Sequence, residues 1–174
     1  MRSNANKTKL ESFLEALGNK ARGSGRIYLT GGASALLIGW RQSTIDVDIK
    51  ADPEPAGLFE ALAELKDKLD LNIELASPDM FIPELPGWRD RSQFIARFGS
   101  IDFYHFDFYS QVLAKLERGH DRDILDVSEI KRLELVSCEI LMELFREIQP
   151  LIKRFPSIEG GVFEQRVLEY CSEL

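Results

Sequence analysis

The chain has 174 residues, 44% of them hydrophobic, and its 22 basic and 29 acidic side chains give a formal net charge of -7. This length is enough for one α/β domain with a helical extension. The acidic balance argues against broad binding of nucleic acid, which depends on lysine and arginine neutralising phosphates. No apolar run approaches the roughly 18 to 20 residues of a membrane-spanning helix, and residues 1–9 are too polar for a signal peptide. We therefore expect a cytoplasmic protein that does not contact a membrane.

The first half of the chain predicts alternating helices and strands. Residues 7–20 carry apolar side chains at helical spacing, and residues 26–30 form a short apolar strand that ends at the glycine pair Gly31-Gly32. Small and apolar residues predict a helix over 33–38 that packs closely on a sheet. Further along, we expect a strand over 44–50, a helix over 58–69, a strand over 71–75, a loop over 83–91, and a hairpin of 94–98 with 100–106.

After residue 108 the pattern is helical. We expect helices over 109–117, 123–133, 137–155 and 162–171, with Pro150 kinking or ending the third of them. The expected domains are an α/β core over 1–107 and a helical C-terminal region over 108–174, packed on that core. The apolar side chains Leu141, Leu144, Phe145 and Ile148 share one helix face, which makes homo-oligomerisation through that face one option.

Two cysteines, Cys138 and Cys171, lie far apart in the sequence, and neither has a second Cys or a His at metal-site spacing. Because we expect a reducing compartment, the simplest interpretation is two free thiols.

The glycine pair Gly31-Gly32 lies between a predicted strand and a predicted helix. Glycine allows a sharp turn and a close approach of the backbone to a ligand. The N-terminus of the following helix offers free N–H groups that suit phosphate. Taken alone, such a turn is more often a steric requirement than a binding site.

Asp46 and Asp48 are two residues apart in the predicted strand 44–50, so their side chains point to the same face. Two carboxylates on one face repel each other unless a cation lies between them. Mg²⁺ suits the position, since it is commonly held by carboxylates together with substrate phosphates. A solvated edge strand is the alternative, but Val47 and Ile49 mark the opposite face as core.

The glycine pair, the interval 33–45 and the following Asp-apolar-Asp-apolar segment together resemble the signature of the DNA polymerase β-like nucleotidyltransferase superfamily. The resemblance implies a small mixed sheet flanked by helices. It further implies that Gly31 and Gly32 hold a nucleoside triphosphate and that Asp46 and Asp48 bind two Mg²⁺ ions. Ser34 matches a hydroxyl that the superfamily often places near the phosphates.

Arg41 and Thr44 also match what small members of the superfamily show just before the acidic strand. Such enzymes usually add a third carboxylate, which binds one metal and serves as or near the general base. Glu74 is the preferred candidate, because its strand follows the acidic one after a single helix. Asp102 is the alternative, and Asp107 is a weaker option.

The segment Lys115–Asp126 resembles a K-x-x-R-(x)4-D-x-x-D motif of abortive-infection (AbiE-type) toxin nucleotidyltransferases and small uncharacterised relatives. Lys115 and Arg118 are one helical turn apart, so both can face one phosphate-rich cleft. The resemblance implies that Asp123 orients Lys115 toward the triphosphate. It also raises the option of a toxin with a partner antitoxin. A helical hairpin with ordinary ion pairs is the alternative.

The combined expectation is a metal-dependent nucleotidyltransferase that moves a nucleotidyl group from a nucleoside triphosphate to an acceptor hydroxyl. The acceptor is left open between an RNA end, a protein and a small molecule. The alternative is a catalytically inactive domain that binds nucleotide or a protein partner. The expected catalytic residues are Asp46, Asp48, Glu74, Lys115 and Asp123, and the expected nucleotide-binding residues are Gly31, Gly32, Ser34, Arg41, Thr44 and Arg118.

Overall fold

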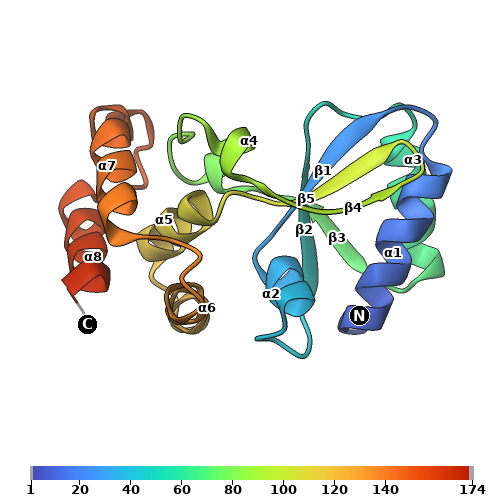
Figure 1. Cartoon of the computed structure of the whole chain (residues 1–174), viewed down its shortest axis with the longest axis horizontal. Helices are drawn as coiled ribbons and strands as arrows, with labels where there is room; N and C mark the ends of the chain where they lie inside the picture. The colour runs from blue at the N-terminus through green and yellow to red at the C-terminus, as the bar shows by residue number, and fades with distance from the viewer. Residues whose placement is uncertain (1, 173–174) are drawn as a thin grey trace. The chain divides into compact units, whose positions relative to one another are not determined.

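A five-stranded mixed sheet forms the centre of the α/β part of the molecule (Figure 1). The computed structural model describes residues 2–172. The strands are β1 (Gly25–Thr30), β2 (Asp46–Ala51), β3 (Asn72–Leu75), β4 (Gln93–Phe98) and β5 (Ile101–His105), in the order β3-β2-β1-β5-β4. β1 is antiparallel to β2 and parallel to β5, β2 is parallel to β3, and β4 is antiparallel to β5. The expected small mixed sheet is therefore confirmed.

The helices follow the predicted periodicity closely. They are α1 (Lys7–Lys20), α2 (Gly32–Ile38), α3 (Leu58–Lys68), α4 (Trp88–Arg91), α5 (Phe108–Arg118), α6 (Asp121–Arg132), α7 (Cys138–Ile148) and α8 (Gly160–Ser172), with short 3-10 helices η1 (Pro78–Met80) and η2 (Gln149–Arg154). Among the described residues, none of these helices has the length and apolar character needed to cross a membrane.

The chain divides into two compact units, and we describe each by itself. The first comprises Met1–Ser77 and Ser92–Phe106, with the sheet and α1 to α3. The second comprises Pro78–Arg91 and Asp107–Leu174, with the remaining helices. The sequence pattern places residues 78–91 with the α/β half, whereas the structure groups them with the C-terminal helices. The expected domain division at residue 107 stays a prediction.

One face of the sheet is apolar because side chains alternate along each strand. Its buried residues include Ile27 and Leu29 of β1 and Val47 and Ile49 of β2, and they form one core with the apolar faces of α1 and α3. The side chain of Asn6 accepts a hydrogen bond from the backbone N–H of Lys9 and so caps α1. This packing leaves the polar residues of β2 on the opposite face of the sheet.

Two expected elements differ from the structure. Trp88–Arg91 forms the short helix α4, so the expectation of a loop throughout 83–91 was wrong there. The expected helix over 137–155 ends at Ile148, and the 3-10 helix η2 follows with Pro150 in its first turn. Proline at this position has no N–H to donate to the preceding turn, which explains why the α-helix stops before it.

The expectation of free thiols was also wrong. Cys138, at the start of α7, and Cys171, near the end of α8, form a disulfide, and no free cysteine occurs among residues 2–172. Their separation in the sequence gave no sign that the two helix ends lie together.

The apolar face of α7 is not available to a second copy of the chain. Leu141, Leu144, Phe145 and Ile148 are all buried within the protein. The Phe145 ring meets the Phe163 ring of α8 edge-on, with centroids 5.0 Å apart. The amphipathic pattern of this helix therefore reflects packing inside the second unit.

Candidate active site

The turn between β1 and α2 requires glycine at both of its first positions. Gly31 has φ 57° and ψ -127°, a backbone conformation that residues with a side chain rarely adopt. A methyl group on Gly32 would collide with the side chain of Thr44 and would lie 3.5 Å from Nη1 of Arg41. A methyl group on Gly31 would lie 3.5 Å from Oδ2 of Asp48. The structure therefore brings the glycine pair together with Arg41, Thr44 and Asp48.

Thr44 packs against the turn between β1 and α2. Its side chain is buried, and its hydroxyl donates a hydrogen bond of 3.1 Å to the backbone oxygen of Asp46. Its backbone pairs with that of Ala5 through two hydrogen bonds, which anchor the start of β2. Thr44 thus holds the acidic strand in place beside Gly32, and its side chain is turned toward the protein.

The two aspartates of β2 lie on the face opposite the core. Val47 and Ile49 are buried, whereas Asp46 and Asp48 are partly exposed. In the register of the sheet, Asp48 lies directly opposite Thr30 of β1. The alternation expected from the sequence is present, and the acidic side chains remain accessible to a ligand.

β3 adds a third carboxylate at the same level of the sheet. Glu74 lies directly opposite Asp48, and Asn72 lies directly opposite Asp46. The Asn72 amide donates hydrogen bonds to Oδ1 of Asp46 and, at 3.2 Å, to Oε1 of Glu74. This amide therefore lies between two of the three acidic side chains.

Asp102 lies far from this cluster. It is opposite Arg26 on β1, four positions before Thr30, which corresponds to roughly 13 Å along the strand at about 3.3 Å per residue. Its carboxylate forms a 2.7 Å ion pair with Nε of Arg97. Between the two candidates left open by the sequence, the structure brings Glu74, and not Asp102, beside Asp48.

Asp107 has a structural position at the start of α5. It is fully buried and accepts two hydrogen bonds from the guanidinium group of Arg91, at 3.1 and 2.8 Å. It also accepts from the hydroxyl of Ser110 and the backbone N–H of Tyr109. A carboxylate with these partners caps the helix and joins it to α4.

The acidic cluster suits a magnesium ion only together with a substrate. Among residues 2–172, no group of three or more His, Cys, Asp or Glu side chains is arranged to hold a metal ion. Mg²⁺ often relies on one or two carboxylates, with waters and substrate phosphates completing its oxygen ligands. Asp46 and Asp48 fit that pattern, because both are oxygen donors on the exposed face next to the glycine turn.

Ser34 lies in the protein interior. It is fully buried, and its hydroxyl donates a 3.1 Å hydrogen bond to the backbone oxygen of Leu29. Because that bond uses its single proton, Ser34 accepts the 3.0 Å hydrogen bond from Nδ1–H of His105. Burial lowers the pKa of His105 to about 4, so the imidazole is neutral at pH 7. To donate to a phosphate, Ser34 would have to give up its bond to Leu29 and become accessible, and its buried position gives that prediction no support.

The Lys115–Asp126 segment forms a compact ion cluster in the second unit. The Lys115 ammonium donates to Oδ1 of Asp123 at 2.9 Å and to Oδ2 of Asp126 at 2.7 Å. Arg118 also donates to Oδ1 of Asp123, at 2.9 Å. Lys115, Asp123 and Asp126 are buried, and the two cations balance the two carboxylates. The structure thus brings all four motif residues together as one neutral network.

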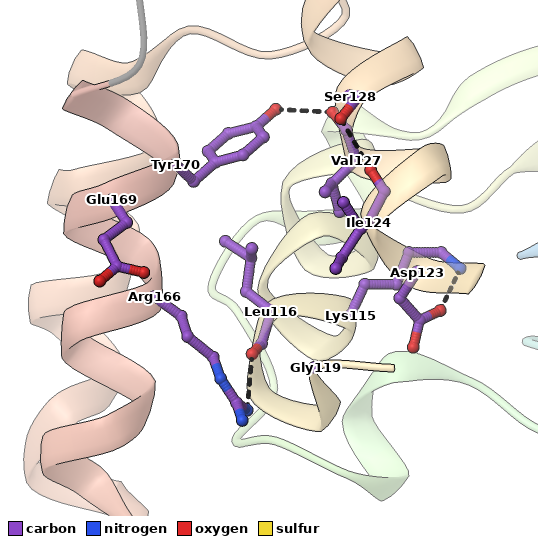
Figure 2. A pocket seen from close by; sticks show the side chains of 10 residues that line it. All are labelled: Lys115, Leu116, Gly119, Asp123, Ile124, Val127, Ser128, Arg166, Glu169 and Tyr170. Atoms are coloured by element: carbon purple, nitrogen blue, oxygen red, sulfur yellow. Dashed lines mark hydrogen bonds and ion pairs between the residues drawn. The ribbon is translucent and has the colours of Figure 1, made fainter. Parts of the chain in front are cut away.

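A cavity of about 290 Å³ lies beside this ion cluster, between α5, α6 and α8 (Figure 2). Figure 2 shows Arg166 and Tyr170 of α8 on one side and Lys115 with Asp123 on the other. Arg166 donates to the backbone oxygens of Leu116 and Glu117 at the end of α5. Oδ2 of Asp123 is buried and has no hydrogen-bond partner among the described residues.

A family model described as "Nucleotidyltransferase of unknown function (DUF6036)" matches residues 8–158. The chain belongs to this family. The matched range contains the glycine pair, both aspartates of β2 and the whole Lys115–Asp126 segment. This confirms the expected place in the nucleotidyltransferase superfamily and supports nucleotidyl transfer as the general activity. No curated protein and no solved structure is significantly similar to the chain.

Three side chains beside the two clusters of this DUF6036 chain were not among the expected site residues, namely Asn72, Arg166 and Tyr170. Asn72 escaped notice because an amide is not part of the superfamily signature, although its strand was predicted. Arg166 and Tyr170 lie in a C-terminal helix whose only signal was apolar periodicity. In this DUF6036 protein the glycine turn and the acidic strand belong to the first unit, whereas Lys115, Arg118 and Asp123 belong to the second. The structure defines these two clusters separately.

Proposed function

We propose that this DUF6036 protein transfers a nucleotidyl group from a nucleoside triphosphate to an acceptor hydroxyl, with Mg²⁺ bound at the acidic strand. The observation that carries the proposal is the position of the Gly31-Gly32 turn against Asp48 and Arg41. A backbone without side chains can approach phosphates closely, and a guanidinium group beside it balances their charge. Two carboxylates on the adjacent strand then supply metal ligands next to the same phosphates.

The residues around the glycine turn and the acidic strand each take a role in the proposed reaction. The acceptor oxygen attacks the α-phosphorus of the triphosphate, and the bond to the departing pyrophosphate breaks. Gly31 and Gly32 receive the phosphate chain, and Arg41 offsets its negative charge. Asp46 and Asp48 hold Mg²⁺, which when bound stabilises the attacking and leaving oxygens of an in-line displacement. In this proposal Glu74 accepts the proton of the acceptor hydroxyl, a role supported by its position opposite Asp48.

The decisive experiment replaces the acidic pair. The Asp46→Asn/Asp48→Asn variant should lose at least about 100-fold in pyrophosphate release from labelled nucleoside triphosphate, because the variant cannot hold the metal that stabilises the transferred group. Unchanged turnover in this variant would rule the proposal out.

A second pair of variants identifies the third carboxylate. Glu74→Gln should reduce turnover strongly, whereas Asp102→Asn should leave it near the wild-type value, because Asp102 lies roughly 13 Å along β1 and is paired with Arg97. The reverse result would assign the role to Asp102. The predicted contacts of Lys115 and Arg118 with the triphosphate, and the orienting role of Asp123, stay proposals. Lys115→Met tests them in the same assay, provided that urea unfolding shows the variant to be folded.

A catalytically inactive nucleotide-binding domain is the second candidate. The position of the Asn72 amide favours it. This amide donates hydrogen bonds to Asp46 and Glu74, so a neutral group lies where a metal ion would otherwise bridge the two carboxylates. Calorimetric titration with Mg²⁺ and each nucleoside triphosphate separates the two candidates. Tight binding without any pyrophosphate release would favour the inactive domain.

A toxin role with a partner antitoxin is an extension of the same proposal. It rests on the resemblance of the Lys115–Asp126 segment to the AbiE-type motif. Expression of the chain should then arrest growth, and the Asp46→Asn/Asp48→Asn variant should not. Growth arrest by both proteins, or by neither, would argue against a toxin that acts through nucleotidyl transfer.

A further inference from the structure

Asn72 of β3 lies among the acidic side chains of the sheet. In the register of β2 with β3 it is opposite Asp46, and Glu74, two residues further along, is opposite Asp48. Residues two apart on a strand point to the same face, and Ile73 between them is buried in the core. The amide of Asn72 therefore shares the open face of the sheet with three carboxylates.

The chemistry of its neighbours determines which way the Asn72 amide points. Its Nδ2 donates to Oδ1 of Asp46 and, at 3.2 Å, to Oε1 of Glu74. The nitrogen and oxygen of an amide are assigned from the groups around them. An ionised carboxylate only accepts hydrogen bonds, so the atom that lies between two of them has to be the NH₂ group.

The two hydrogen bonds of Asn72 take the place of a cation between Asp46 and Glu74. Two carboxylates that share a site repel each other unless positive charge or hydrogen-bond donors offset the repulsion. The amide hydrogens carry partial positive charge and do so, but they would repel a metal ion at the same place. Within residues 2–172, no group of three or more His, Cys, Asp or Glu side chains is arranged to hold a metal ion. An amide that separates Asp46 from Glu74 explains why these acidic side chains do not form such a group.

The remaining oxygen ligands of β2 lie toward the glycine turn. Oδ2 of Asp46 has no hydrogen-bond partner within the described part of the chain. A methyl group on Gly31 would lie 3.5 Å from Oδ2 of Asp48, so this carboxylate borders the turn. Mg²⁺ is usually bound through one or two carboxylates, with waters and substrate phosphates as its other ligands. Asp46 and Asp48 therefore offer one position for an ion, on the side where the proposed function places the phosphates.

We propose that Asn72 is a positioning residue that restricts this site to a single Mg²⁺ ion, held by Asp46 and Asp48 together with the triphosphate. Asn72 thereby keeps Glu74 out of the set of metal ligands. The inference rests on the proposed nucleotidyl transfer and departs from the two-ion site that the superfamily resemblance implies. Glu74 is held through an amide and not through a metal ion, so it stays available to the acceptor hydroxyl.

The test counts the Mn²⁺ ions bound to the full chain, by electron paramagnetic resonance, in the presence of a non-hydrolysable α,β-methylene nucleoside triphosphate. Mn²⁺ is a suitable probe because it takes the same carboxylate, carbonyl and water ligands as Mg²⁺. The wild type should bind a single ion per chain at saturation. Asn72→Asp keeps the shape of the side chain but replaces the donor by a carboxylate. This variant should bind a second ion, because the new carboxylate and its neighbours Asp46 and Glu74 repel one another until they share a cation.

Two further variants serve as controls. Asn19→Asp makes the same change of charge at an exposed position of α1, a helix that packs on the opposite, apolar face of the sheet. It should bind a single ion, as the wild type does. Asn72→Ala removes both hydrogen bonds but none of the proposed metal ligands, so it should keep that ion. Near-UV circular dichroism checks that each variant is folded.

The possible ion counts separate this inference from the proposed function. Two ions bound to the wild type, or no second ion in a folded Asn72→Asp variant, would overturn the inference and leave nucleotidyl transfer standing. Loss of the ion in Asn72→Ala would show that Asn72 is itself a metal ligand, and would also overturn it. No ion in the wild type would contradict both proposals. The expected counts without pyrophosphate release from a hydrolysable triphosphate would remove the proposed function and leave the role of Asn72 intact.

Discussion

The glycines of this chain differ in how much space an added methyl group would have. A methyl group on Gly32 would collide with Thr44, whereas one on Gly161, in the first turn of α8, would have no atom within 4 Å. We therefore predict that Gly32→Ala lowers the free energy of unfolding by about 1–3 kcal/mol, the usual effect of overpacking. Gly161→Ala should change it by less than about 1 kcal/mol, in the stabilising direction. Urea unfolding of both variants measures the difference, and equal effects would contradict the tight packing at Gly32.

His105 makes the stability of the protein depend on pH. Its pKa is about 4 in the folded chain, against about 6.5 in an unfolded one, because burial disfavours the charged imidazole. As the pH falls, His105 is therefore protonated in the unfolded chain before it is protonated in the folded one. The free energy of unfolding that burial of neutral His105 contributes above pH 6.5 is lost between pH 6.5 and pH 4. Between pH 7 and pH 5 the loss should be about 2 kcal/mol.

The control for this prediction is His105→Gln, which keeps a donor for Ser34 but does not titrate. Its free energy of unfolding, measured by urea at both pH values, should fall less than that of the wild type by about 2 kcal/mol. A parallel decline of the two proteins would show that other groups cause the pH dependence.

Some site residues could be predicted from the sequence, whereas the environment of others could not. Gly31, Gly32, Asp46 and Asp48 were recognisable because their roles depend on neighbours close in the chain. The environment of Ser34 was not, because its partner His105 comes from β5, 71 residues away. A hydroxyl beside a glycine pair looks the same in the sequence whether it faces a ligand or the core.

At the level of elements, periodicity predicted the strands and most helices because each depends on local alternation of apolar residues. Register between strands depends on long-range pairing, and the choice between Glu74 and Asp102 depended on it. Only the parallel pairing of β2 with β3 places Glu74 opposite Asp48.

The pairing of α5 with α6 depends on a buried ammonium group. Lys115 is 7% exposed and bonds two carboxylates, so its removal leaves Asp123 and Asp126 buried beside one remaining cation, Arg118. We predict that Lys115→Ala lowers the free energy of unfolding by about 3–5 kcal/mol. Urea unfolding provides the measurement.

Lys20 offers a matched control, because its ammonium forms a 2.6 Å ion pair with Glu64 on the surface. Such pairs contribute little when water and salt screen them. Lys20→Ala should therefore leave the urea midpoint almost unchanged, and a loss as large as that of Lys115→Ala would contradict the distinction between the buried and the exposed pair.

The division into two units has a consequence for how the chain can be cut and synthesised. The polypeptide passes between the units after Ser77, after Arg91 and after Phe106, so no single cleavage separates them. A gene fragment that stops at Phe106 would encode Arg91 without its partner Asp107 and without Ser110, which also bonds Asp107. During translation these early residues leave the ribosome first and stay incomplete until the later helices emerge. Isolating the first unit would require ending the chain at Phe106, deleting residues 78–91 and joining Ser77 to Ser92 directly.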